Sequence, residues 1–379
     1  MSRSVELQFG VCVPVFAMPG AGFFRTPAWT RLDPPLAVAA AVEAERLGYD
    51  SVWVADHLIH GSDGGILEGW TTLSVIAGRT ERVRLGTIHM AQALRPPSLG
   101  AKITATLDAL SGGRLIVFYD WGGEAEALSY GLPYPPEEER TGRLDEGLRL
   151  ITELWAAEAP LDFAGEYYTT RGAVCRPKPV QQPHPPIWIG EARSDAWLDL
   201  VCRRATGWNS VPASPERLAE KLERLRAACD RAGRDPASLE LSLETQILIA
   251  PTEAEAKARA REIAALPAPP PVRPPAPPPP PGGAPARPGG GGGGARRREE
   301  LLAAIREEDP RPLSAVAPDW LVGSPEAVLA QIETYAAMGI SHFLLWFLDF
   351  PSLDGMRLFA EGVAPRLRAG RAPPAQRDG

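Results

Sequence analysis

Short strand-like runs alternate with amphipathic helical segments along most of this chain. The strand-like runs, rich in branched and aromatic residues, are Val5–Val15, Ser51–Ala55, Val83–Thr87, Arg114–Phe118, Ile187–Ile189, Gly207–Val211, Leu239–Ile249 and His342–Leu348. The helical segments include Pro34–Leu47, Trp70–Arg79, Arg143–Trp155, Ser194–Ala205, Pro215–Ala232, Ser324–Met338 and Asp354–Leu367. A strand followed by a helix, repeated about eight times, is typical of a parallel (β/α)8 barrel. We therefore predict one α/β barrel domain over residues 1–379, with insertions at its C-terminal face.

Local signals mark several element ends. Asp33 precedes the first helix as an N-cap, and Gly48 ends it. The residues from Thr252 to Glu255 form a capping box. The aromatic and proline-rich stretch Ala159–Pro186 predicts a small hairpin on the surface. Pro267–Gly294 is almost wholly proline, glycine and alanine, and predicts a disordered insertion, either without a role or acting as a lid. A flexible tail is expected over residues 369–379.

Composition excludes several classes of protein. The net charge of −7 argues against a nucleic-acid partner. The four cysteines form no CxxC pair, so neither a zinc site nor a disulfide framework is predicted, and no metal is expected. The N-terminus has no apolar core of a signal peptide, and no run reaches the ~18 apolar residues of a membrane span. A cytoplasmic protein without membrane contacts is expected.

Ionisable residues follow three consecutive strands. Asp56 and His57 end the strand Ser51–Ala55, and His89 follows the next strand. Asp120 and Glu124 follow the fourth strand. Because all strands of a parallel barrel end at one face, where such enzymes carry their active sites, these side chains are predicted to meet there. The pattern indicates an enzyme that binds a small molecule.

Four stretches give the chain a likeness to a known family: Gly48–Leu58, Arg82–Arg114 (notably the run TLDALSGGR), Pro177–Asn209 and Leu321–Trp346. In these it resembles the bacterial luciferase-like flavin-dependent oxidoreductases, which include monooxygenases and deazaflavin-dependent dehydrogenases. The resemblance implies a (β/α)8 barrel with a flavin at the C-terminal rim. The likeness covers nearly the whole chain except the proline-glycine insertion and the tail after Arg368.

The resemblance also implies roles for individual residues. His57 is the expected acid/base group, and Glu124 the expected catalytic acid. The residues expected to bind the cofactor are His89 and Gln92 at the polar edge of the ring, Trp121 by stacking on the ring or the substrate, and Gly190, Arg193 and Ser194 around its phosphate. Free backbone N–H groups at a helix start attract phosphate; Ser194 can instead simply cap its helix.

Other residues at the predicted rim are open to plainer readings. The chain departs from relatives at Phe118–Trp121. Relatives usually have a glycine-rich strand end here, whereas the bulky side chains of this chain are expected to narrow the pocket. Glu191 is unfavourable beside a phosphate unless it is turned away. A solvated side chain is expected for Arg95, and a structural role for His342. The spacing of His57 and His60 is a weak metal signal, because no third ligand is evident.

Three functions are consistent with these residues. The first, which the sequence favours, is a monooxygenase that takes reduced FMN from a separate flavin reductase and oxygenates a small organic substrate with O2. The second is a dehydrogenase or reductase that uses the deazaflavin coenzyme F420, in which His57 and Glu124 would be the acid/base groups. The third is a non-catalytic flavin binder with a degenerate site, which the bulky end of the fourth strand alone supports. A homodimer is a further expectation from the family.

Overall fold

Eight parallel strands close into a barrel in the computed structural model, which describes residues 6–20, 23–191, 194–267, 292–306 and 309–369. The order around the barrel is β1-β2-β3-β5-β8-β9-β10-β12, and β12 pairs with β1 to close it. These strands are β1 (Gln8–Cys12), β2 (Ser51–Ala55), β3 (Arg84–Ile88), β5 (Leu115–Asp120), β8 (Ile187–Ile189), β9 (Gly207–Ser210), β10 (Glu240–Ile249) and β12 (His342–Phe347). The predicted fold class is confirmed.

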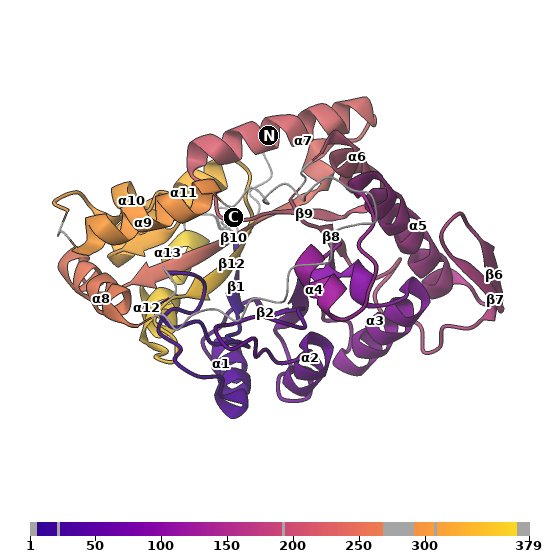
Figure 1. The fold of residues 1–379 in the computed structure, drawn as a ribbon, viewed down its shortest axis with the longest axis horizontal. Coiled ribbons are helices and arrows are strands. Elements are labelled where there is room, and N and C mark those ends of the chain that lie inside the picture. Colours follow the sequence, from indigo (N-terminus) through magenta and orange to yellow (C-terminus); the bar gives the residue numbers. More distant parts are fainter. Residues whose placement is uncertain (1–5, 21–22, 192–193, 268–291, 307–308, 370–379) are drawn as a thin grey trace, which may run out of the picture.

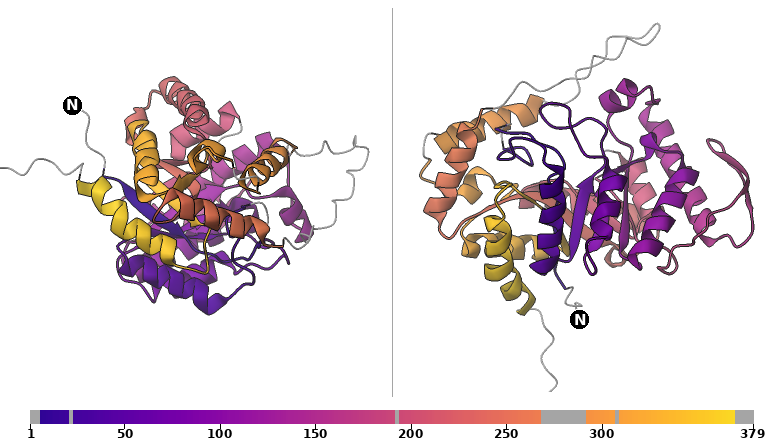
Figure 2. Two further views of the ribbon diagram at one scale, coloured as in Figure 1. Left: turned by 90° about the vertical axis from the view of Figure 1, so that its left-hand side faces the viewer. Right: turned by 90° about the horizontal axis from the view of Figure 1, so that it is seen from below.

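Helices surround the strands in chain order (Figure 1). They are α1 (Pro34–Arg46), α2 (Gly69–Ala77), α3 (Pro97–Ser111), α4 (Glu124–Ser129), α5 (Glu137–Ala156), α6 (Asp195–Arg204), α7 (Pro215–Arg231), α8 (Glu253–Ala265), α9 (Gly292–Arg306), α10 (Leu313–Val316), α11 (Pro325–Ala337), α12 (Asp354–Gly362) and α13 (Ala364–Ala369). A hairpin of β6 (Leu161–Ala164) and β7 (Thr169–Ala173) projects beyond α5 (Figures 1 and 2), as the aromatic excursion predicted.

Two tryptophans fill the barrel interior. Trp53 of β2 and Trp188 of β8 stack with ring centroids 5.1 Å apart, and both are fully buried. Glycines on other strands make room for them: a Cβ at Gly86 would lie 2.2 Å from the Trp53 ring, and one at Gly207 would lie 2.5 Å from Trp188. At the N-terminal ends of the strands, His342 contacts Ser51 Oγ at 2.7 Å. The predicted structural role of His342 agrees with this position.

The TLDALSGGR run, which carried much of the family likeness, joins neighbouring segments of the chain through hydrogen bonds. Asp108 accepts hydrogen bonds from the amides of Val180 and Gln181, which fastens the excursion loop to α3. Arg114 donates to the carbonyls of Ala77, Thr80 and Val83 (2.8–3.0 Å), so it joins the end of α2 to the start of β5. These residues hold the scaffold and lie away from the rim.

Some boundaries differ from the predicted ones. Helix α5 begins at Glu137 rather than at Arg143, with three glutamates in its first turn that favour a helix N-terminus. The predicted closing helix is broken into α12 and α13, because Pro365 cannot donate the hydrogen bond that would continue α12. Most of Pro267–Gly294 lies outside the described residues, but α9 begins at Gly292, so the last three residues of that segment are helical.

None of the helices in the described ranges is long and apolar enough to cross a bilayer.

Candidate active site

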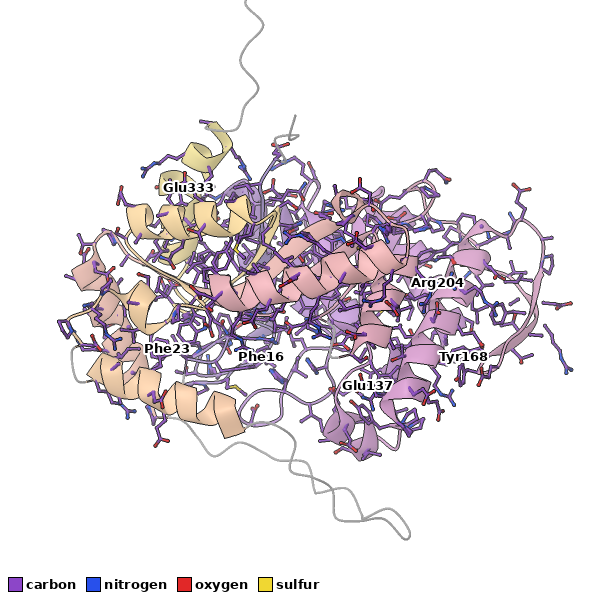
Figure 3. All side chains as sticks on the ribbon, turned by 90° about the horizontal axis from the view of Figure 1, so that it is seen from above. Phe16, Phe23, Glu137, Tyr168, Arg204 and Glu333 are labelled. Atoms are coloured by element: carbon purple, nitrogen blue, oxygen red, sulfur yellow. The ribbon has the colours of Figure 1, made fainter. Side chains whose placement is uncertain are left out.

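A cavity of about 510 Å³ opens at the C-terminal ends of the strands. Its volume lies within the ~300–1,000 Å³ that is usual for small-molecule sites. The lining residues are Arg25, His57, His60, Ile88, His89, Ala91, Asp120, Trp121, Gly122, Gly123, Tyr134, Glu137, Arg140, Glu191, Trp197 and Val211. Glu137 stands at the start of α5 (Figure 3). The polar ends of β2, β3 and β5 therefore meet at one cavity, as their sequence pattern predicted.

His57 is held by a carboxylate that the sequence analysis did not single out. Its Nδ1 lies 3.0 Å from Glu126 Oε2, and the Glu126 carboxylate also accepts from the amides of Leu58 and Ile59. Burial opposes ionisation of Glu126, but these hydrogen bonds outweigh it and lower its pKa. The ionised carboxylate keeps the proton of His57 on Nδ1, so Nε2 is the basic nitrogen of the ring.

Glu124, the predicted catalytic acid, does not take that place. It is exposed at the start of α4 and does not line the cavity, whereas Glu126, two residues further along the same short helix, is buried against His57. Both residues belong to the GGEAEA run, and a strand-end glutamate could be read at either position. The contact with His57 is what separates them.

His60 stacks on His57. The two rings are nearly parallel, at 11°, with centroids 4.9 Å apart. The edge of Phe16, labelled near the centre of Figure 3, packs against His60 at 4.2 Å. Burial, together with the neighbouring His57 and Arg25, lowers the pKa of His60 to about 3. His60 is therefore neutral. The described residues contain no group of three or more His, Cys, Asp or Glu side chains that could hold a metal ion.

His89 lies between two carboxylates. Its Nδ1 is 3.2 Å from Asp120 Oδ2, and its Nε2 is 3.2 Å from Glu244 Oε2. Burial acts against the charged ring, but the two hydrogen bonds prevail and raise the pKa of His89 to about 9. Glu244 is fully buried inside the barrel, and it also accepts from Arg25 (2.9 Å) and from Trp346 Nε1 (2.7 Å). His89 is thus a fixed imidazolium in the cavity wall.

Arg25 and Glu244 were missed by the sequence analysis. Glu244 carried a signal that could have been read, since it is the one charged residue in the strand run LSLETQILI. Arg25 had none, because it lies in a long loop after β1 that has no periodic pattern.

Arg95 is the clearest correction at the rim. A solvated side chain was expected, but Arg95 makes two hydrogen bonds to Asp56, at 2.7 and 2.8 Å, and a third to Glu68 at 2.8 Å. Asp56 is only 1% exposed, and its carboxylate is directed to Arg95 and to the amide of Ala91. The acid of the Asp56–His57 pair is therefore structural: it orders the loop after β3 and leaves His57 to the cavity.

Only some of the predicted cofactor-binding residues line the described cavity. His89 and Trp121 line the cavity, and Trp121 is 5% exposed. Gln92 is buried and points to α5, where a Cβ on Gly147 would lie 2.9 Å from its Nε2. Gly190 accepts a hydrogen bond from Trp197 Nε1 at 3.0 Å. Gln92 and Gly190 are absent from the described lining.

The loop after β8 is only partly described. Ser194 caps α6 by accepting from the amide of Trp197 at 3.4 Å, and Arg193 lies outside the described residues. Glu191 lines the cavity but is bound by Lys221 Nζ at 2.6 Å, which neutralises the carboxylate that was expected to oppose a phosphate.

The bulky end of the fourth strand does not block the cavity. Phe118 is fully buried within the barrel, with its ring centroid 4.6 Å from that of His89. Beyond it the chain reaches Gly122, at φ +97°, where a Cβ would lie 2.9 Å from Ala91. Gly122 and Gly123 line the cavity with Trp121, so backbone is exposed to the cavity just beyond the bulky side chains.

The chain has relatives along almost its full length. A model of the luciferase-like monooxygenase family matches residues 9–342. An F420-dependent glucose-6-phosphate dehydrogenase from Nakamurella multipartita is 30% identical over 337 residues, which cover 87% of this chain and 91% of the relative.

Solved structures agree in fold. An F420-dependent secondary alcohol dehydrogenase in complex with an F420-acetone adduct superposes with a TM-score of 0.67 at 20% identity, covering 96% of this chain and 99% of the other. EDTA monooxygenase from Chelativorans sp. BNC1 gives a TM-score of 0.70 at 18% identity, covering 97% and 95%. The family match and the 30% identical relative show that this chain is an oxidoreductase belonging to the luciferase-like monooxygenase family.

Proposed function

We propose that the chain is a dehydrogenase or reductase that uses the deazaflavin coenzyme F420, with His57 and Glu126 as its acid/base pair. The contact between His57 Nδ1 and Glu126 Oε2 carries the proposal, because it leaves a basic nitrogen at a cavity large enough for a tricyclic ring and a small substrate. The 30% identical relative is itself named for F420-dependent dehydrogenation. This support favours the second of the three functions drawn from the sequence over the FMN- and O2-dependent one.

The residues around the cavity suit a flat, polar-edged ring. Trp121 and Trp197 offer aromatic faces, and Gly122 and Gly123 present backbone without side chains. These residues would hold the coenzyme, which when bound accepts a hydride from a substrate carbon. His57 would receive the proton of the substrate hydroxyl at Nε2, and Glu126 would stabilise the resulting imidazolium. In the reverse direction the same pair would return the proton.

Cofactor titration tests the proposal directly. Oxidised F420 and FMN are added separately to the purified chain, and binding is followed by fluorescence. Tight binding of F420 and weak binding of FMN is the expected result. Tight FMN binding, with oxygen consumption once the FMN is reduced, would instead establish the monooxygenase that the sequence analysis favoured. Binding of neither would leave the chain without a flavin function.

The His57→Ala variant separates chemistry from binding. We expect turnover to fall by about 10²–10⁴-fold, the usual contribution of a general acid or base. F420 affinity should stay within a few fold of the parent, since His57 is one of many lining residues. Loss of affinity with turnover intact would remove His57 from the mechanism.

A further inference from the structure

Among the residues that the structure describes, the ionic side chains around the cavity leave little positive charge available for an anionic substrate. The described lining contains three cations: Arg25, His89 and Arg140. Arg25 is bound to Glu244 at 2.9 Å, and His89 lies between Asp120 and Glu244 at 3.2 Å from each. Two of the three cations are therefore already compensated by carboxylates.

Arg140 is the third cation, and neighbouring protein groups already contact its guanidinium. Its guanidinium lies 4.3 Å from the centroid of the Tyr134 ring, and its Nη1 donates to the carbonyl of Pro135 at 2.8 Å. It sits one helical turn from Glu137, which lines the same cavity. A single arginine in this position supplies at most one unit of charge.

Three carboxylates face the same space. Asp120, Glu137 and Glu191 line the cavity, and Glu191 has Lys221 as its counter-ion. The Asp120 side chain is 38% exposed, and it is fixed by His89 and by the amide of Trp121 at 2.5 Å. Asp120 is paired with His89, as Glu244 is with Arg25 and Glu191 with Lys221. Among the described lining residues, a phosphate dianion placed here would therefore have Arg140 alone as its counter-charge, beside the Glu137 carboxylate, and an uncompensated charge is costly.

The rest of the lining suits a carbon skeleton. Apart from the residues given above to the coenzyme, Ile88, Ala91 and Val211 present aliphatic side chains. Asp120 can accept a hydrogen bond from a hydroxyl group of a bound molecule. We propose that the substrate of this site is an uncharged alcohol with an apolar body, such as a cycloalkanol, and not a sugar phosphate. The inference rests on the proposed function and adds the class of substrate to it.

The reaction balances with groups already named. The hydroxyl proton passes to His57 Nε2, the hydride on the same carbon passes to oxidised F420, and the alcohol becomes a ketone. The two electrons lost by the alcohol are those gained by the coenzyme.

Three alcohols test the substrate class with the F420-loaded chain. Cyclohexanol, glucose and glucose 6-phosphate are compared by kcat/KM; glucose and glucose 6-phosphate differ only in the phosphate. We expect cyclohexanol to exceed glucose 6-phosphate by at least tenfold, and glucose 6-phosphate to gain nothing over glucose. A preference for glucose 6-phosphate over both, or oxidation of none of the three by a chain that binds F420, would overturn the inference. Failure to bind F420 would overturn the proposed function itself, and the titration detects it beforehand.

A charge variant tests the electrostatic argument. The Ki of glucose 6-phosphate against cyclohexanol oxidation is measured for Glu137→Gln and for Glu138→Gln, its neighbour in the same helical turn that does not line the cavity. We expect Glu137→Gln to lower the Ki several-fold because one facing carboxylate is lost, and Glu138→Gln to leave it unchanged. An equal Ki in both variants and the parent would contradict the role given to the cavity charges.

Discussion

At the scale of single residues, the site depends on which glutamate contacts His57. The side chain of His57 is 29% exposed and that of Glu126 is 9% exposed, so the histidine is open to the cavity while its partner is shielded. His57 was predicted from the family resemblance, because relatives place an acid/base histidine just beyond this strand. The sequence could not choose between Glu124 and Glu126, since which of two glutamates on a short helix turns inward depends on how that helix packs.

Matched glutamine variants resolve that choice. Glu126→Gln removes the charge that holds the Nδ1 proton of His57, so we expect kcat to fall by about 10–100-fold, as for other carboxylates that orient a histidine. Glu124→Gln, an exposed neighbour, should match the parent enzyme. Steady-state kinetics with F420 provides the measurement. The opposite ranking of the two variants would reinstate the acid that the sequence analysis proposed.

The pKa of His89 gives the stability of the chain a pH dependence. This pKa is raised from 6.5 to about 9 by the carboxylates of Asp120 and Glu244. A group whose pKa is raised on folding contributes its full stability below its unfolded pKa and loses it as pH rises through the folded value. We therefore expect the free energy of unfolding to decline between pH ~6.5 and ~9.

Urea unfolding at several pH values checks this expectation. The decline should be smaller in His89→Gln, which cannot take up the proton. His184→Gln is the control, because that histidine bonds a carbonyl rather than a carboxylate, with Nδ1 2.7 Å from Pro185 O. A decline of unchanged size in His89→Gln would show that other groups cause it.

At the scale of elements, most of the strands and helices were readable because their periodicity and caps agree. Asp33 accepts from the amide of Leu36 at 3.2 Å, and Thr252 from the amide of Glu255 at 3.2 Å, as their cap signals predicted. Helix α4 was not predicted; it has six residues, too few for a periodic pattern to emerge. The element that carries Glu126 was thus the one least visible in the sequence.

Packing of β3 against β2 depends on Gly86 having no side chain. Gly86→Ala would place a Cβ 2.2 Å from the Trp53 ring, which is held by Trp188, so the strands must shift. We expect a loss of about 1–3 kcal/mol in the free energy of unfolding. Gly78→Ala is the control, because the nearest atom to its added Cβ is 3.7 Å away. Chemical denaturation measures both, and equal stability of the two variants would contradict the packing argument.

At the scale of the whole molecule, the barrel was the most predictable property. Eight strand-helix units admit few other arrangements, and the family likeness pointed to the same fold. The charge network of Arg25, His89, Asp120 and Glu244 was out of reach, because its members come from four separate parts of the chain and meet only once the barrel is closed. Long-range ion pairs leave no local pattern in a sequence.

Ligand binding should stabilise the molecule as a unit, because the cavity is built from the ends of strands that all belong to one closed sheet. At F420 concentrations about 100 times the Kd, we expect about 2.7 kcal/mol of added stability, seen as a rise in Tm. His57→Ala should show a similar rise if its part is in proton transfer. An unchanged Tm at saturating F420 would argue against binding at the cavity.

The acid and the base of the dyad are 69 positions apart and are delivered by different strand-helix units. In the proposed mechanism, a polypeptide emerging from the ribosome therefore carries the histidine before the matching glutamate is added, and is inactive until both are present. On the same proposal, a cut made between β2 and α4 would yield two inactive pieces, whose activity would return only through their reassembly.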